Sequence, residues 1–253
     1  MPKIAMLGLG EAGSAFARDL LKQGVQVNAW DPAPKHLPAG INFAQSNAEA
    51  ARGADIILSA NLAAVALDIA HELLPALSPE QLFAEMNTAS PKLKQDIAEL
   101  LRPTGARVID VAIMAPVPLK GLGTPMLVSG EGAKDFAKLM RPLGMPVSVV
   151  EGEVGLAAQH KLLRSIAYKG IAAVIIECLE AAKKFDKEAY AREQITSLIG
   201  DETMIDRFVE GSYQHALRRK HEMEAVKAML AEVGVSAFST EASILRLDEL
   251  LKG

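Results

Sequence analysis

Three glycines near the start of the chain restrict its fold more than any other feature. Residues 3–7 (KIAML) have the character of a buried strand, and Gly8, Gly10 and Gly13 follow at once. Apolar residues then recur at helical spacing as far as Leu21. A strand, a tight turn and a helix in this order are typical of a doubly wound α/β sheet, whose ligands bind beyond the carboxyl ends of the strands.

The spacing of the glycines predicts a turn that binds a dinucleotide. Gly8 permits the turn, Gly10 lets the backbone approach a pyrophosphate, and Gly13 lets the helix pack closely on the strand. The start of the helix offers unpaired N–H groups and a partial positive charge to an anion. We therefore expect the cofactor phosphates on Gly8, Leu9, Gly10, Glu11, Ala12 and Gly13.

An acidic residue follows at the end of the second predicted strand. Residues 25–31 (VQVNAWD) end on Asp31, 18 residues after Gly13. A carboxylate at this place accepts both hydroxyls of the adenosine ribose and repels a 2′-phosphate, so Asp31 favours NAD. Lys35 nearby leaves NADP open as the alternative cofactor. The competing interpretation is that Asp31 only caps the strand before Pro32.

Strand-like and helix-like segments alternate as far as residue 150, and no strand signal returns after that. This order predicts an α/β fold: an N-terminal Rossmann, doubly wound parallel sheet, followed by a smaller all-helical C-terminal domain. We expect an NAD(P)-binding domain in residues 1–152 and a domain for substrate binding and dimerisation in residues 153–253. The expected C-terminal helices cover 155–184, 187–198, 202–230 with a break near Gly211, and 239–251.

Polar residues follow other strands of the predicted sheet. Each of them alone is typical of a turn or a cap. Because ligands bind at this edge, we expect Asn61 and Leu62 to contact the cofactor, and Asn87 and Thr88 to contact its nicotinamide ribose.

Lys161, Ser165 and Lys169 follow one another at four-residue intervals, so they stack on one side of the first long C-terminal helix. Periodicity alone is typical of a solvated helix face. The functional interpretation places Lys161 over the nicotinamide as a general acid/base, because a partly desolvated lysine beside another cation has a lowered pKa. Ser165 and Lys169 would then position the substrate or tune Lys161.

Composition excludes several classes of function. A net charge of −4 and a pI near 5.8 give no reason to expect a nucleic-acid partner.

The single cysteine, Cys178, is expected to be a small core residue in a reducing compartment. The chain shows no cleavable signal and no apolar run long enough to span a membrane, so we expect a soluble cytoplasmic protein that acts on a small molecule. No metal is expected, because ligand spacing is lacking among His36, His71, His160, His215 and His221.

The chain resembles the β-hydroxyacid dehydrogenases, the group of 3-hydroxyisobutyrate, tartronate semialdehyde and 6-phosphogluconate dehydrogenases. The glycine loop carries the resemblance, together with residues 87–91 (NTASP), 155–161 (GLAAQHK) and 221–235 (HEMEAVKAMLAEVGV). The resemblance implies reversible NAD(P)-dependent oxidation of a small hydroxy acid, with Lys161 in the place of the catalytic lysine. It also implies a homodimer built on the helical domain.

The chain departs from the family's pattern where the substrate would bind. The family's Asp-Ala-Pro-Val-Ser-Gly-Gly corresponds to residues 110–116 (DVAIMAP) here. Ser165 stands in the place of an asparagine, and His221 in the place of a lysine. The expected substrate contacts are therefore altered, and they are Met114, Ala115, Pro116 and His221.

These departures indicate a divergent branch and leave three functions open. The first is a hydroxyacid dehydrogenase. The second is an imine or ketone reductase, which the apolar character of residues 114–116 favours. The third is an NAD(P)-binding redox sensor without turnover, which the loss of the substrate motif allows.

Overall fold

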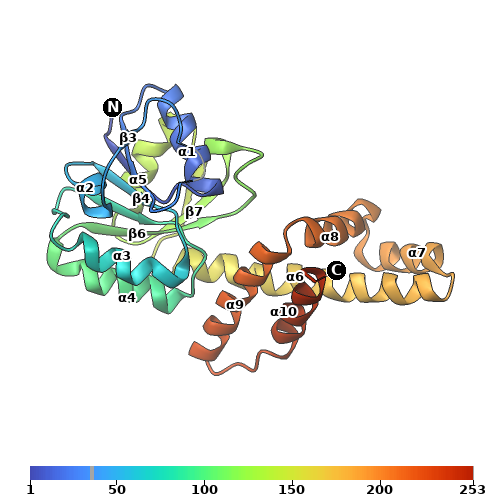
Figure 1. Cartoon of the computed structure of the whole chain (residues 1–253). Coiled ribbons are helices and arrows are strands. Elements are labelled where there is room, and N and C mark those ends of the chain that lie inside the picture. Colours follow the sequence, from blue (N-terminus) through green and yellow to red (C-terminus); the bar gives the residue numbers. More distant parts are fainter. Residues whose placement is uncertain (35–36, 253) are drawn as a thin grey trace. The chain divides into compact units, whose positions relative to one another are not determined.

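The computed structural model describes residues 1–34 and 37–252 (Figure 1). Lys35 and His36, which entered the expectations above, lie outside the described residues. The chain forms two compact units, Met1–Gln159 and His160–Gly253.

The first unit is built on an eight-stranded sheet with the order β3-β2-β1-β4-β5-β6-β7-β8. Neighbouring strands are parallel except for the antiparallel pair β6 and β7. The chain reverses its direction of winding after β3 and returns to the other side of β1, which makes the carboxyl ends of β1 and β4 neighbours. The strands are β1 Ile4–Leu7, β2 Val27–Trp30, β3 Asn42–Phe43, β4 Ile56–Ser59, β5 Leu82–Glu85, β6 Arg107–Ile113, β7 Met126–Ser129 and β8 Val147–Val149.

Helices cover both faces of this sheet, because its central strands are apolar on both sides. Ile4 and Met6 of β1 belong to one core with α1 (Glu11–Lys22) and α5 (Ala133–Met140). The alternate residues of β1 belong to a second core, on the opposite face, with α2 (Asn47–Ala51), α3 (Ala66–Leu73) and α4 (Pro91–Leu101). Short 3-10 turns occur at η1 Ala63–Val65, η2 Arg102–Thr104, η3 Gly121–Gly123 and η4 Arg141–Leu143.

The remaining elements are helical. They are α6 Leu156–Lys184, α7 Glu188–Ile199, α8 Glu202–Gln214, α9 Ala216–Glu232 and α10 Phe238–Leu250. One apolar cluster joins the C-terminal half of α6 to α7 and α8 and includes Phe208. Another joins Leu162 of α6 to α9 and α10 and includes Met223. The predicted fold class, a Rossmann-type sheet followed by a helical region, is confirmed.

Two details of the helical unit correct the sequence expectations. The break expected near Gly211 lies at His215, between α8 and α9. Gly211 stays inside α8 and serves close packing, since a Cβ there would overlap Nη2 of Arg219. Cys178, expected in the core, is exposed. It lies next to Ile175 on α6, but there it faces an open groove together with the exposed Val174 and is not covered by another helix of the described chain.

No helix among the described residues is both long and apolar enough to cross a membrane.

Candidate functional site

The loop between β1 and α1 has the shape that a diphosphate requires. Gly8 has a φ of +96°, and a Cβ there would lie 2.5 Å from the carbonyl oxygen of Ala60. A Cβ on Gly13 would overlap the carbonyl oxygen of Gly8. At Gly10, the residue before α1, a Cβ would meet no atom of the described chain within 4 Å. The loop is therefore closed on the protein side and open at Gly10, where phosphate oxygens can approach the helix N-terminus.

Asp31 lies beside this loop at the end of β2. Its Oδ2 accepts a hydrogen bond from the backbone N–H of Leu9 at 2.7 Å, and its Oδ1 accepts one from the N–H of Ala33 at 2.8 Å. Each carboxylate oxygen retains a further acceptor position for a ribose hydroxyl. The geometry thus fits both interpretations of Asp31, the strand-end cap and the ribose reader.

The other residues expected at the cofactor differ in exposure. Leu9 is buried, Glu11 is exposed in the first turn of α1, and Ala12 is partly buried against the core of the sheet. Leu62 is 63% exposed after β4. Thr88 is partly buried after β5.

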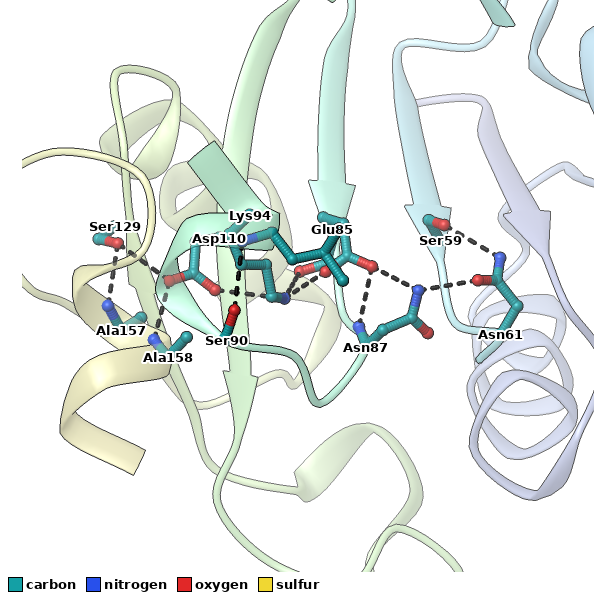
Figure 2. Close-up of polar contacts among 11 residues, drawn as sticks. Ser59, Asn61, Glu85, Asn87, Ser90, Lys94, Asp110, Ser129, Ala157 and Ala158 are labelled. Atoms are coloured by element: carbon teal, nitrogen blue, oxygen red, sulfur yellow. Dashed lines mark hydrogen bonds and ion pairs between the residues drawn. The ribbon is translucent and has the colours of Figure 1, made fainter. Parts of the chain in front are cut away.

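The structure brings Asn61 and Asn87 together at the carboxyl ends of β4 and β5 (Figure 2). Nδ2 of Asn87 donates to Oδ1 of Asn61 at 2.8 Å, and Nδ2 of Asn61 donates to Oγ of Ser59 at 3.1 Å. The Asn87 amide and its backbone N–H both donate to Oε1 of Glu85. Two residues that the sequence marked separately are thus parts of one hydrogen-bonded row.

The row continues into a buried cluster of charges that the sequence analysis missed. Lys94 of α4 is 1% exposed, forms an ion pair with the Glu85 carboxylate, and lies 3.3 Å from Oδ1 of Asp110. Its ammonium also donates to the backbone carbonyl of Glu85 at 2.8 Å. Lys94 has the helical spacing of the buried residues Ile97 and Leu101, and a lysine on an apolar face is the signal that could have revealed this cluster.

Burial and neighbouring charge act in opposite directions within this cluster. At Lys94, burial works against the charged form, but the carboxylates of Glu85 and Asp110 together raise its pKa. At Glu85, burial is the stronger influence and raises the pKa, although Lys94 opposes it. One cation thus faces two buried carboxylates, and at Glu85 its attraction does not compensate for the loss of water.

Asp110 also holds the first turn of α6. Its Oδ2 accepts a hydrogen bond from the backbone N–H of Ala158 at 2.8 Å, and Oγ of Ser129 accepts one from the N–H of Ala157 at 3.0 Å. These bonds satisfy N–H groups that a helix start leaves without an intrahelical partner. One polar row therefore runs from Asn61 to α6 (Figure 2).

The segment expected to contact the substrate follows β6. Met114, Ala115 and Pro116 are all partly buried, and the N–H of Met114 donates to the carbonyl of Pro125 at 2.9 Å.

In the helical unit, the structure joins Ser165 and Lys169 to a carboxylate from another helix. Nζ of Lys169 donates to Oγ of Ser165 at 3.0 Å and forms an ion pair with Glu222 of α9. Arg218 lies 2.9 Å from the same carboxylate. Glu222 was not expected from the sequence, because a glutamate within a helix rich in charged residues gives no separate signal. His221, the neighbouring residue, is exposed.

The same cluster of charges favours the ionised form of Glu222 and disfavours the ionised form of Lys169. Burial opposes the charge of Glu222, but Lys161, Lys169 and Arg218 together lower its pKa to about 2. Burial lowers the pKa of Lys169, and Arg219 and Arg218 add to this against the single carboxylate of Glu222. The cations outnumber the carboxylate, so it stays ionised while the ammonium of Lys169 is disfavoured.

Comparison with known proteins places the chain in a family. Residues 3–152 match the NAD binding domain of 6-phosphogluconate dehydrogenase, and residues 193–247 match a domain of unknown function, DUF1932. An uncharacterised 28.5 kDa protein of Methanothermus fervidus is 25% identical over 233 residues, 87% of this chain and 88% of that protein. A 3-hydroxyisobutyrate dehydrogenase of Pseudomonas aeruginosa is 28% identical over 146 residues, 54% of this chain and 49% of that enzyme. The chain thus matches about half the length of that curated dehydrogenase.

Solved structures show the same architecture. A conserved protein of unknown function, itself described as similar to 3-hydroxyacid dehydrogenases, has a TM-score of 0.81 and 26% identity, covering 98% of this chain and 96% of that chain. The 3-hydroxyisobutyrate dehydrogenase of Mycobacterium tuberculosis has a TM-score of 0.83 at 19% identity, over 98% and 93% of the two chains. An imine reductase from Myxococcus stipitatus has a TM-score of 0.69 at 18% identity, over 100% and 94%.

The matched residues 3–152 contain the glycine loop, Asp31 and the row of polar residues at the ends of β4, β5 and β6. The resemblance to hydroxyacid dehydrogenases is confirmed, and so is an NAD(P) cofactor. The chain therefore belongs to the family of proteins built on the NAD-binding domain of 6-phosphogluconate dehydrogenase.

Proposed function

We propose that this protein is an NAD(P)-dependent oxidoreductase that transfers a hydride between the nicotinamide and a small hydroxy acid or its keto form. The observation that carries the proposal is the glycine loop, closed at Gly8 and Gly13 but open at Gly10, with the Asp31 carboxylate beside it. The nicotinamide, when bound, supplies the hydride acceptor or donor. The protein supplies binding, orientation and the path of the proton.

Lys161 is the proposed general acid/base. As the hydride leaves the carbinol carbon of the substrate, the hydroxyl proton passes to the neutral amine of Lys161, and reduction of the keto form returns it. We propose that Ser165 and Lys169 position the substrate or tune Lys161. Lys169 contacts both Ser165 and Glu222, which supports a role for these residues as a unit.

The charge of the cluster favours an anionic substrate. The cations Lys161, Lys169 and Arg218 act on the Glu222 carboxylate, so the positive charges outnumber the negative one. A net positive cluster attracts a carboxylate. We propose His221 and the segment 114–116 as further substrate contacts.

Two other functions remain candidates. The partly buried apolar side chains of Met114 and Pro116 favour an imine or ketone reductase, because they offer no hydroxyl to a carboxylate. The same departure allows a redox sensor that binds NAD(P)H without turnover.

A substrate panel separates these functions. The panel compares wild type with Lys161→Ala and with the control Lys183→Ala, which changes an exposed lysine on the same helix. The substrates are hydroxy acids, keto acids, uncharged ketones and imines, and each is tested with NAD(H) and with NADP(H). We expect turnover of hydroxy or keto acids that Lys161→Ala lowers by about 10²–10⁴-fold with unchanged NADH affinity. Near-normal turnover by Lys161→Ala would contradict the mechanism. Activity on ketones or imines alone favours the reductase, and tight NADH binding without any turnover favours the sensor.

We also propose that the helical unit forms a homodimer. A groove of about 740 Å³ lies between α6, α7 and α10 and is lined mainly by apolar side chains, including the exposed Val174, Leu198 and Leu245. Burial of such a face against a second copy removes apolar surface from water. Light scattering should give twice the monomer mass for wild type and the monomer mass for Leu198→Glu. A wild-type monomer would contradict the proposal.

A further inference from the structure

Asn87 contains a buried acceptor atom without a partner. The residue is 5% exposed, and no described residue donates a hydrogen bond to its Oδ1. A buried carbonyl oxygen without a donor is destabilising and is rare in native proteins. A hydrogen-bond donor from outside the described residues, such as a ligand, would satisfy this atom.

The orientation of the Asn87 amide is determined by its neighbours. Nδ2 donates one N–H to Oδ1 of Asn61 and the other to Oε1 of Glu85. A flipped amide would place Oδ1 against these two acceptor oxygens. The Asn61 amide donates to Ser59 through its own Nδ2, and its Oδ1 accepts from Asn87. Both donors of Asn87 are thus occupied, and only its acceptor is available to a ligand.

Glu85 in turn depends on Lys94. Both side chains are about 1% exposed, and the ammonium forms an ion pair with the carboxylate while donating to the backbone carbonyl of the same residue. Because Lys94 contacts both the side chain and the backbone carbonyl of Glu85, Oε1 of Glu85 is held in one position relative to the Asn87 amide. Figure 2 shows the Asn87 oxygen turned away from Glu85, past the ends of the strands.

We propose that Glu85 and Lys94 are positioning residues for the dinucleotide: they hold the Asn87 amide so that Oδ1 accepts a hydrogen bond from the nicotinamide half of the cofactor. This rests on the proposed function only in that the dinucleotide occupies the carboxyl edge of the sheet. The nicotinamide half offers two kinds of donor, the ribose hydroxyls and the carboxamide N–H.

Binding measurements test the proposal without turnover. NADH and AMP are titrated against wild type, Asn87→Ala, Glu85→Gln, Asn87→Asp and the double variant Glu85→Gln/Asn87→Asp, with melting temperatures recorded for each. We expect Asn87→Ala and Glu85→Gln to weaken NADH about three- to tenfold, the effect of one neutral hydrogen bond. AMP, which lacks the nicotinamide half, should bind all variants as it binds wild type. A merely structural role would weaken both ligands equally.

The double variant Glu85→Gln/Asn87→Asp gives the most specific test of the contact between these two residues. In Asn87→Asp two carboxylates face each other, and NADH binding should fall further than in Asn87→Ala. The double variant exchanges the carboxylate and the amide between the two positions, so its net charge equals that of wild type. The new amide at position 85 can donate to the new carboxylate at position 87. NADH affinity should therefore recover to within about threefold of wild type.

Several outcomes would overturn the proposal: wild-type NADH affinity in Glu85→Gln, an equal loss of AMP and NADH affinity, or a double variant weaker than Asn87→Asp. If Glu85→Gln does not fold, Glu85→Asp carries the same test, because its shorter side chain keeps the charge opposite Lys94 but withdraws the acceptor from the Asn87 amide. The reduced 3-acetylpyridine analogue, which lacks the carboxamide N–H, identifies the donor: a penalty in Asn87→Ala that persists assigns it to the ribose. A wild type that does not bind NADH at all would instead contradict the proposed function.

Discussion

The carboxylate of Asp31 and the backbone N–H of Leu9 are joined by a 2.7 Å hydrogen bond, which ties the end of β2 to the glycine loop after β1. The residue proposed to distinguish the adenosine ribose from its 2′-phosphate form therefore also supports the loop proposed to receive the phosphates. A substitution at Asp31 can act through either role, and two variants are needed to separate them.

We expect Asp31→Ala to weaken NADH by about ten- to a hundredfold, because hydrogen bonds to a charged acceptor are lost. NADPH should lose less, since the repulsion of its 2′-phosphate is removed as well. Asp31→Asn keeps an acceptor for one backbone N–H while losing the charge. It should therefore shift the preference toward NADPH with a smaller loss of melting temperature. Fluorescence titration measures both affinities, and an unchanged NADH to NADPH ratio would count against Asp31 as the ribose reader.

Alanine substitutions at Gly13 and Gly10 should have different effects on stability and on NADH binding. Gly13→Ala places a Cβ against the carbonyl oxygen of Gly8, so we expect a large loss of stability or a failure to fold. Gly10→Ala meets no described atom within 4 Å, so its melting temperature should stay close to that of wild type. Its methyl group would occupy the place proposed for the phosphates and should weaken NADH binding by about tenfold or more. Wild-type NADH affinity in Gly10→Ala would show that the pyrophosphate binds elsewhere.

The buried lysine of α4 should matter far more than its exposed neighbour. Lys94→Met leaves two buried carboxylates without their cation and should cost about 3–5 kcal/mol. For a chain of this size that lowers the melting temperature by roughly 10 °C. Lys92→Met, which removes an exposed ion pair with Asp96 on the same helix, should change stability by less than about 1 kcal/mol. Equal melting temperatures for the two variants would show that the buried cluster contributes nothing.

The Glu222 carboxyl predicts a pH dependence of stability. Its pKa of about 2 in the folded protein lies below its ordinary value of 4.5. Its contribution is therefore complete above about pH 4.5 and is lost as the pH falls toward about 2. The two pKa values correspond to roughly 3 kcal/mol.

Denaturant titrations of wild type and Glu222→Gln measure this contribution. The difference in unfolding free energy should be constant above about pH 4.5 and should shrink as the pH falls below it. Glu224→Gln, an exposed glutamate on the same helix, should run parallel to wild type throughout. A Glu222→Gln profile parallel to wild type between pH 4.5 and 2 would mean that this carboxyl is not held by its cations.

Local spacing in the sequence was sufficient to determine the class of fold. The strand before Gly8, the helix after Gly13 and the acid at the end of β2 are consecutive elements whose periods and turn residues depend on near neighbours in the chain. The same local signals marked Asn61 and Asn87 as separate candidates and placed Ser165 and Lys169 on one side of a helix. Their roles at the cofactor or substrate remain predictions.

Tertiary structure alone decided which groups from different elements come together. Glu85, Lys94 and Asp110 come from β5, α4 and β6, and Glu222 reaches Lys169 from another helix. The exposure of Cys178 and the break at His215 were likewise decided by packing. The charge state of a buried group depends on the groups around it in space and on its removal from water, and neither quantity is encoded in the spacing of residues along the chain.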